Sequence, residues 1–368
     1  MISILTRRPK LDKGKKNILA AGSGKSWYVL FRPVHERLAA DPRLDFWFTG
    51  RNLAGKNRPE KDFMSWGLSP KRIIREKASN EAFFDLFITP VYHYIEGCRN
   101  RFAVQTFHTT SFRHVSIDPR IKKYDRFFIY GDYMKRKFVE KGILSKDDPR
   151  FVMIGMPVLD RLVDGSLDSN KIKSDLKIDN GKPTVIYAPT CTTLSTLFTD
   201  GFNIIDTICN MDVNFLMKPH YDTYDMFDSP VDWAKEFARI SKKYPNFREI
   251  KDLDIVPYMY VSDTMISDAS SVIWQFLVLD RPVIFMDFDM EKFKENWPMM
   301  DFEPWGRKMG PVVKTKDDLI RSVEDAIGHP ERYGELRRAC AADNFYKPGT
   351  ATERTVSEIY KLLGIEPA

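Results

Sequence analysis

The sequence predicts an α/β protein made of two doubly wound, Rossmann-like domains that face a central cleft. Short apolar runs, typical of buried parallel strands, alternate with segments of helical apolar spacing along most of the chain. The alternation is interrupted between residues 160 and 182, where Asp, Ser, Lys, Asn and Gly dominate. At 368 residues the chain is long enough for two such domains.

The composition is that of a globular protein with a sizeable core, at 43% hydrophobic and 29% charged residues. A net charge of +6 suits an anionic substrate or a lipid surface, and because no DNA- or RNA-binding signature accompanies it, we expect no nucleic-acid partner. The four cysteines are scattered without a C-x-x-C pair, which indicates reduced thiols in the cytoplasm and neither a zinc site nor a disulfide framework.

The N-terminus is basic, with six Lys and Arg residues between Arg7 and Lys16. It lacks the apolar core of a signal peptide, and no apolar run approaches the length of a transmembrane helix. We favour a solvated end over contact with an anionic membrane. The expected location is cytoplasmic, with peripheral binding to the inner face of the membrane as the alternative.

The first half contains six predicted strands. They are residues 17–21, 44–48, 84–88, 102–106, 126–130 and 151–154. A Gly-rich turn at 22–26 opens a helix through Ala40, and a second helix at 131–141 ends at Gly142. The turn ends like a P-loop, but Leu19 occupies the position of that motif's first glycine, so a Rossmann-like turn explains it better.

The second half repeats the alternation. Its predicted strands are 184–188, 213–217, 247–250, 264–267, 283–286 and 311–314, and its last helices are 316–328, 330–342 and 350–363. The predicted domains are residues 1–158 and 159–345, followed by a closing helix at 346–368.

The segment from Thr264 to Met286 is the most informative strand–turn–helix–strand unit. Asp268-Ala-Ser-Ser271 places small polar N-cap residues between a strand and a helical pattern that extends to Asp280. Unpaired N–H groups at such a helix start, beside the hydroxyls of Ser270 and Ser271, suit a phosphate. An ordinary capped helix is the alternative.

Polar side chains recur where predicted strands end, which is where ligands bind in α/β sheets. His108, Thr109 and Thr110 follow one strand, Thr190 a second, Lys218 and His220 a third, and Asp268, Ser270 and Ser271 a fourth. Gly22 and Ser23 follow the first strand. We expect these loops to converge on one pocket.

His108 and His220 are the candidate catalytic residues, one in each half, because histidine accepts or donates a proton near neutral pH. Lys218 offers a positive charge for phosphate. No convincing carboxylate pair is present, and Asp287 and Asp289 come nearest. We therefore expect chemistry without a metal or other cofactor, with cationic side chains and helix termini stabilising the phosphate charge.

Several of these motifs together resemble the CDP-glycerol glycerophosphotransferases of teichoic-acid and capsule synthesis. The resemblance spans about residues 100–360 and lies in Gln105–Thr110, Ala188–Thr190, Lys218–His220, Ile266–Ser271, Leu279–Phe285 and Gly349–Arg354. It implies a GT-B fold and transfer of glycerol phosphate, or a related alditol phosphate, from a CDP-activated donor to a hydroxyl of a lipid-linked or polysaccharide acceptor, with release of CMP.

The resemblance also implies that the domain of residues 1–158 binds the acceptor and that the domain of residues 159–345 binds the nucleotide donor. It implies roles for individual residues as well. His108 would be the general base and His220 would stabilise the leaving group. Thr190, Lys218, Asp268, Ser270, Ser271 and Arg354 would bind the donor and its phosphates, and Thr109, Thr110, Gly22 and Ser23 would lie on the acceptor side.

The chain departs from the family pattern at two positions. Thr109 stands where the family usually has Gly, and Cys191 stands where an aromatic residue often follows the Pro-Thr pair. Three alternatives stay open: a GT-B glycosyltransferase that uses a nucleotide sugar, an enzyme like the UDP-sugar 2-epimerases, and a nucleotide-binding protein without activity.

Overall fold

A computed structural model describes residues 8–22, 27–50, 59–90, 94–108, 119–225, 229, 231–296 and 305–367. The chain forms two compact units, one of Met1–Asp160 with Asn344–Ala368 and the other of Arg161–Asp343. Each boundary between the units lies two residues from the predicted domain limit, at 160 instead of 158 and at 343 instead of 345. The C-terminal helix belongs to the first unit. The predicted limits of the domains stay predictions.

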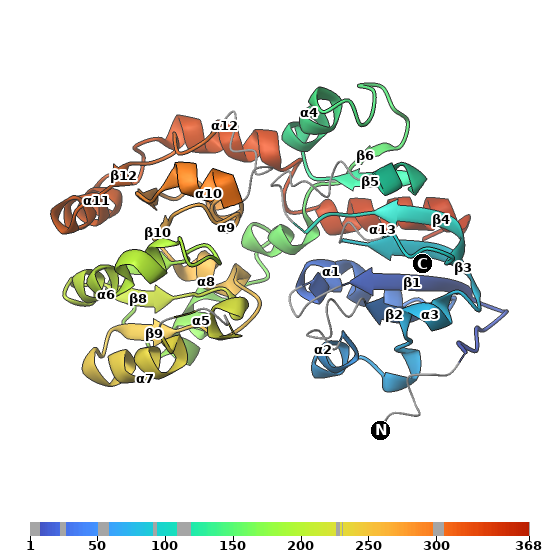
Figure 1. The fold of residues 1–368 in the computed structure, drawn as a ribbon, viewed down its shortest axis with the longest axis horizontal. Helices are drawn as coiled ribbons and strands as arrows, with labels where there is room; N and C mark the ends of the chain where they lie inside the picture. Colours follow the sequence, from blue (N-terminus) through green and yellow to red (C-terminus); the bar gives the residue numbers. More distant parts are fainter. Residues whose placement is uncertain are drawn as a thin grey trace. The chain divides into compact units, whose positions relative to one another are not determined.

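The first unit contains a parallel sheet of six strands in the order β2-β1-β3-β4-β5-β6 (Figure 1). The strands are β1 (Lys16–Gly22), β2 (Leu44–Gly50), β3 (Phe83–Thr89), β4 (Arg99–Gln105), β5 (Arg126–Ile129) and β6 (Phe151–Met153). The helices are α1 (Trp27–Ala39), α2 (Pro59–Ser65), α3 (Glu76–Ser79), α4 (Asp132–Glu140) and α13 (Ala351–Leu363).

Helix α13 completes the core of this unit although it lies at the end of the chain. Its residues Val356, Ile359 and Leu363 are buried in one cluster with α1 and β1. The carboxylate of Asp160 holds the start of α13 by accepting hydrogen bonds from the backbone N–H groups of Gly349, Ala351 and Thr352 at 2.7–3.0 Å. Such a carboxylate satisfies N–H groups that have no partner inside the helix.

The second unit contains another parallel sheet of six strands, in the order β12-β11-β10-β7-β8-β9 (Figure 1). The strands are β7 (Thr184–Tyr187), β8 (Asn214–Met217), β9 (Phe247–Glu249), β10 (Thr264–Ser267), β11 (Val283–Met286) and β12 (Val312–Val313). The helices are α5 (Ser169–Leu176), α6 (Thr196–Cys209), α7 (Trp233–Lys243), α8 (Val256–Val261), α9 (Val272–Phe276), α10 (Met290–Asn296), α11 (Lys316–Gly328) and α12 (Gly334–Asn344).

The strand order of the second sheet is that of dinucleotide-binding Rossmann domains, with the reversal between β7 and β10. Every residue of β7, β8, β10 and β11 is buried. Burial on both faces explains why these strands read as uninterrupted apolar runs in the sequence. The predicted α/β class, with two parallel sheets, is confirmed.

Two local predictions differ from the structure. The polar region 160–182 contains helix α5, whose start is capped by the Asp168 carboxylate accepting from the N–H of Lys171. The helix predicted to extend to Asp280 is α-helical only over α9, and a 3-10 turn at Leu277–Leu279 follows it. Asp280 then adopts a left-handed conformation with φ of 50°, which ends the helical run.

Candidate functional site

The predicted donor-side residues of the second unit lie at the carboxyl edge of its sheet. Thr190 follows β7, Lys218 and His220 follow β8, and the segment Asp268–Ser271 follows β10. Because β7 and β10 are neighbours at the point where the strand order reverses, their loops lie where α/β sheets bind ligands. The segments that sequence analysis selected are therefore at one edge.

Asp268 fixes the loop after β7 to the end of β10. The side chain is 1% exposed. One carboxylate oxygen accepts from the backbone N–H groups of Thr190 and Ala269, each at 2.7 Å. The other accepts from the backbone N–H and the hydroxyl of Thr196 at 2.9 and 3.0 Å. The structure thus gives Asp268 a positioning role for Thr190, and its predicted contact with the donor stays a prediction.

Ser270 and Ser271 are half-buried beside the start of α9. Ser271 is the N-cap residue, and its side chain makes no capping hydrogen bond. The helix that follows has only five residues, so its dipole is smaller than the predicted longer helix would provide. The two hydroxyls, more than the helix, are what this segment offers to a phosphate.

Lys218 is half-buried, and its ammonium donates to the carbonyl of Pro219 at 3.1 Å. Burial lowers the pKa of Lys218 to about 8, against the opposing effect of the carboxylates of Asp252 and Asp254. An ammonium that is partly stripped of water interacts more strongly with an anion than a solvated one.

His220 lies at the start of the turn that follows β8. Its Nδ1 accepts a hydrogen bond from the backbone N–H of Asp222 at 3.2 Å, and the imidazole packs against the ring of Tyr221 with the two planes tilted by 31°. Because Nδ1 is an acceptor, the neutral ring carries its proton on Nε2. His220 is therefore a hydrogen-bond donor through Nε2.

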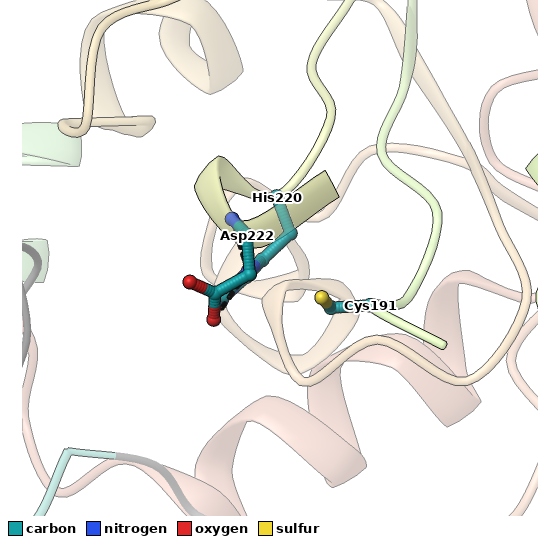
Figure 2. Close-up of side chains that lie close together, drawn as sticks. All are labelled: Cys191, His220 and Asp222. Atoms are coloured by element: carbon teal, nitrogen blue, oxygen red, sulfur yellow. Dashed lines mark hydrogen bonds and ion pairs between the residues drawn. The ribbon is translucent and has the colours of Figure 1, made fainter. Parts of the chain in front are cut away.

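Cys191 and Asp222 are neighbours of His220 that sequence analysis did not select. Nδ1 of His220 lies 3.5 Å from Oδ2 of Asp222, and Cys191 approaches from the loop after β7 (Figure 2). Burial, with a smaller contribution from Asp222, raises the pKa of Cys191 to about 12. Asp222 is only two residues from His220, so the sequence could have indicated that these two residues are neighbours. Cys191 is a neighbour of His220 only because β7 pairs with β8.

His108, the candidate base, is at the carboxyl edge of the sheet in the first unit. Its Nδ1 lies 3.2 Å from the carbonyl oxygen of Pro90, which follows the neighbouring strand β3. A carbonyl only accepts, so Nδ1 carries the proton and Nε2 holds the lone pair of the neutral ring. The preceding carbonyl, of Phe107, accepts from the hydroxyl of Tyr130. The hydrogen bond to Pro90 therefore orients the imidazole of His108 and makes Nε2 its basic nitrogen.

Gly22 ends β1, and a Cβ at this position would lie 2.1 Å from the ring of Trp27. The glycine thus permits the first residue of α1 to pack against the end of the strand. Its acceptor-side role stays a prediction. Ser23, Thr109 and Thr110 lie outside the described residues.

Arg354 lies in α13 and belongs to the first unit. Its guanidinium donates to the carbonyls of Ile154, Tyr346 and Lys347 at 2.8–2.9 Å and to the hydroxyl of Thr350 at 2.5 Å. All four partners belong to the same unit, so these hydrogen bonds give Arg354 a structural role in the first unit. Its predicted contact with the donor stays a prediction.

A family model of the CDP-glycerol:poly(glycerophosphate) glycerophosphotransferases matches residues 83–361, which is most of the chain. The chain belongs to this family of enzymes. The predicted resemblance is thereby confirmed, and it extends further toward the N-terminus than the motifs indicated.

Curated relatives agree with the family. A teichoic acid glycerol-phosphate primase of Bacillus spizizenii is 26% identical over 58% of this chain and 53% of its own length. A teichoic acid glycerol-phosphate transferase of Staphylococcus aureus is 24% identical over 65% of this chain and 61% of its own length. The chain thus matches somewhat more than half the length of each of these two glycerophosphotransferase relatives.

Solved structures confirm the fold. The wall teichoic acid polymerase TagF, in a variant form, matches with a TM-score of 0.71 at 17% identity, over 96% of this chain and 90% of that chain. A UDP-GlcNAc 2-epimerase from Neisseria meningitidis matches with a TM-score of 0.58 at 12% identity, over 94% of this chain and all of that chain. At these identities the likeness shows the GT-B-like fold alone. Within the described residues, no helix is both long and apolar enough to span a bilayer.

Proposed function

We propose that this glycerophosphotransferase-family member transfers glycerol phosphate, or a related alditol phosphate, from a CDP-activated donor to a hydroxyl of a lipid-linked or polysaccharide acceptor, and releases CMP. The observation that carries the proposal is the hydrogen bonding of the two histidines. His108 has a defined basic Nε2, and His220 has a defined donor Nε2–H. Transfer of a phosphate group to a hydroxyl is accelerated by a base that accepts the proton of the hydroxyl and by a donor that stabilises the leaving group.

In the proposed reaction the oxygen of the acceptor hydroxyl forms a bond to the phosphorus of the glycerol phosphate. The proton of that hydroxyl passes to Nε2 of His108. The bond from this phosphorus to the oxygen bridging to CMP breaks, and the electron pair stays on CMP. His220 donates a hydrogen bond from Nε2 to the leaving phosphate, which stabilises the charge that develops there.

The other proposed contacts with the CDP-activated donor come from residues at the carboxyl edge of the second sheet. Lys218 supplies a positive charge for the pyrophosphate, and Thr190, Ser270 and Ser271 supply hydroxyls. Asp268 acts on the donor through the position it gives to Thr190. On the acceptor side we retain Gly22, Ser23, Thr109 and Thr110. The transfer step itself uses no metal ion.

The test is calorimetric binding of CMP, CDP-glycerol, UMP and a UDP-sugar to the wild-type chain, to Ser271→Ala and to the control Ser241→Ala, an exposed serine of α7. We expect selectivity for cytidine and an affinity for CDP-glycerol that falls about tenfold in Ser271→Ala alone, the loss expected for one hydrogen bond to a charged group. Selectivity for uridine would replace this proposal by a nucleotide-sugar glycosyltransferase. Binding of none of the four ligands would overturn it.

A further inference from the structure

A cluster of three metal-ligating side chains lies at the edge of the second sheet. Cys191 comes from the loop after β7, and His220 and Asp222 come from the segment after β8 (Figure 2). One ligand atom from each residue lies within 4.8 Å of the other two. Among the residues that the structure describes, no other group of three His, Cys, Asp or Glu side chains meets this criterion.

Both segments that carry the cluster are fixed by main-chain hydrogen bonds. The residue before Cys191, Thr190, donates its N–H to the buried carboxylate of Asp268. On the other side, the carbonyl of His220 accepts from the N–H of Thr223 at 3.0 Å, which closes the turn that contains Asp222. Hydrogen bonds within the protein therefore hold the backbone that carries the three side chains.

We propose that Cys191, His220 and Asp222 bind a thiophilic divalent cation, of which Zn²⁺ is the biological example. A thiolate, an imidazole nitrogen and a carboxylate oxygen form a donor set that zinc prefers, whereas Mg²⁺ and Ca²⁺ prefer oxygen alone. Three protein ligands leave the fourth position of a tetrahedral centre for a water molecule.

The distances fit this assignment with a small adjustment. Metal–ligand bonds of about 2.0–2.3 Å place the ligand atoms of a tetrahedral zinc centre about 3.5 Å apart. Nδ1 of His220 and Oδ2 of Asp222 are already 3.5 Å apart. All separations are at or below 4.8 Å, so a shift of the Cys191 Sγ by about 1 Å toward the other two ligand atoms, through rotation of its side chain, completes the centre. Nδ1 then exchanges its 3.2 Å hydrogen bond from Asp222 for the metal.

An ion pair without a metal explains only part of the cluster. His220 and Asp222 are two residues apart in one turn, so their contact arises locally. Cys191 is brought to them by the pairing of β7 with β8, and it adds the one soft ligand. Since the side chains of His220 and Asp222 are 42% and 56% exposed, a cation reaches them directly from solvent.

The test uses the full chain, reduced and freed of metal, with metal alone as the ligand. Co²⁺ is titrated first, because a cobalt–thiolate bond gives a charge-transfer absorption band, and Zn²⁺ is then measured in competition with a chromophoric chelator. We expect one cation per chain and the thiolate band. Cys191→Ser should abolish the band, and Asp222→Asn should weaken binding by at least about tenfold.

Two controls separate the site from general effects. Cys209→Ser removes a buried thiol of α6, and Asp212→Asn removes an exposed carboxylate that pairs with Lys182, so both should bind like the wild type. Thermal unfolding of each variant without metal shows whether it is folded. The wild-type titration tests the proposal even if Cys191→Ser fails to fold.

Absence of stoichiometric binding by the wild type would overturn the proposal, and so would a thiolate band that persists in a folded Cys191→Ser variant. No nucleotide or acceptor is present in these titrations. Their outcome is therefore independent of whether the chain transfers glycerol phosphate.

Discussion

The two candidate catalytic histidines differ in the partner that each Nδ1 has. Nδ1 of His108 donates to the carbonyl of Pro90, whereas Nδ1 of His220 accepts from the N–H of Asp222. In each case a main-chain group selects the tautomer of the neutral ring. Nε2 is then a proton acceptor in His108 and a hydrogen-bond donor in His220. Two residues of the same type, at the edges of similar sheets, thus differ in the hydrogen-bonding capacity of Nε2, which agrees with the opposite proton roles proposed for them.

The largest expected effect concerns this difference. His108→Gln should lower kcat by about 10²–10⁴, because an amide cannot accept the proton of the acceptor hydroxyl. The affinity for CDP-glycerol should change little. His220→Gln should lose less activity, since the amide N–H of glutamine still donates to the leaving phosphate.

The measurement is steady-state transfer together with calorimetric donor binding for each variant. His329→Gln serves as the control, because this exposed histidine lies after α11. Equal losses of kcat in the variants of His108 and His220 would contradict the division of roles.

The next largest effect concerns the carboxyl edge of the second sheet. There the buried carboxylate of Asp268 binds the loop after β7 to the end of β10. Asp268→Asn places amide hydrogens against N–H groups and removes charge-assisted bonds, so we expect a loss of about 3 kcal/mol in the free energy of unfolding. Asp212→Asn, at an 85% exposed side chain, should cost less than about 1 kcal/mol. Denaturant unfolding measures both, and equal effects would show that Asp268 is not a brace.

Arg354 supplies a corresponding brace in the first unit. Arg354→Ala removes four hydrogen bonds, one to the carbonyl of Ile154 after β6 and three to the segment directly before α13, and we expect the free energy of unfolding to fall by about 2 kcal/mol. Arg321→Ala, at an exposed position of α11, is the control. Donor affinity of the folded Arg354 variant should stay within about twofold of wild type. A tenfold weaker affinity would instead support the donor contact predicted from the sequence.

The smallest effect is a pH dependence at Lys218. Its pKa is about 8 in the folded chain, below the value of 10.5 that a solvated lysine has. Between these two values the unfolded chain binds more protons, so stability should rise with pH across that window. Donor affinity should fall as pH rises above about 8, because the ammonium loses its charge. Lys218→Met should remove both dependences. Affinity that is flat from about pH 7 to about pH 9 in the wild type would exclude Lys218 from the donor site.

The sequence predicted those features that depend on apolar pattern. The four central strands of the second sheet, β7, β8, β10 and β11, are buried on both faces, and the positions of all its strands agree with the predicted ones within a residue or two. Helix α5 escaped prediction because it has no buried residue, so its signals were only the Asp168 cap and the Lys171–Asp175 pair. The position of the donor-side segments at one edge of the second sheet was also predicted, because polar residues after strand ends are visible in sequence.

What sequence could not supply were the contacts made between segments. The placement of Cys191 beside His220 depends on strand pairing, and the use of the Asp268 carboxylate as a brace depends on a loop 78 residues away. Arg354 was assigned to a ligand because a cation near the end of the family motif suits phosphate. Its main-chain partners are visible only once α13 is folded against β6.

The return of α13 to the first unit has a consequence during synthesis of the chain. The second unit is encoded without interruption, so it can fold as soon as it has left the ribosome. Most of the first unit is synthesised earlier, but it lacks α13 until the whole second unit has been synthesised. Until then, the carboxylate of Asp160 lacks the N–H groups of Gly349, Ala351 and Thr352 as partners. Loss of α13 by truncation or proteolysis would therefore destabilise the first unit and leave the second unit folded.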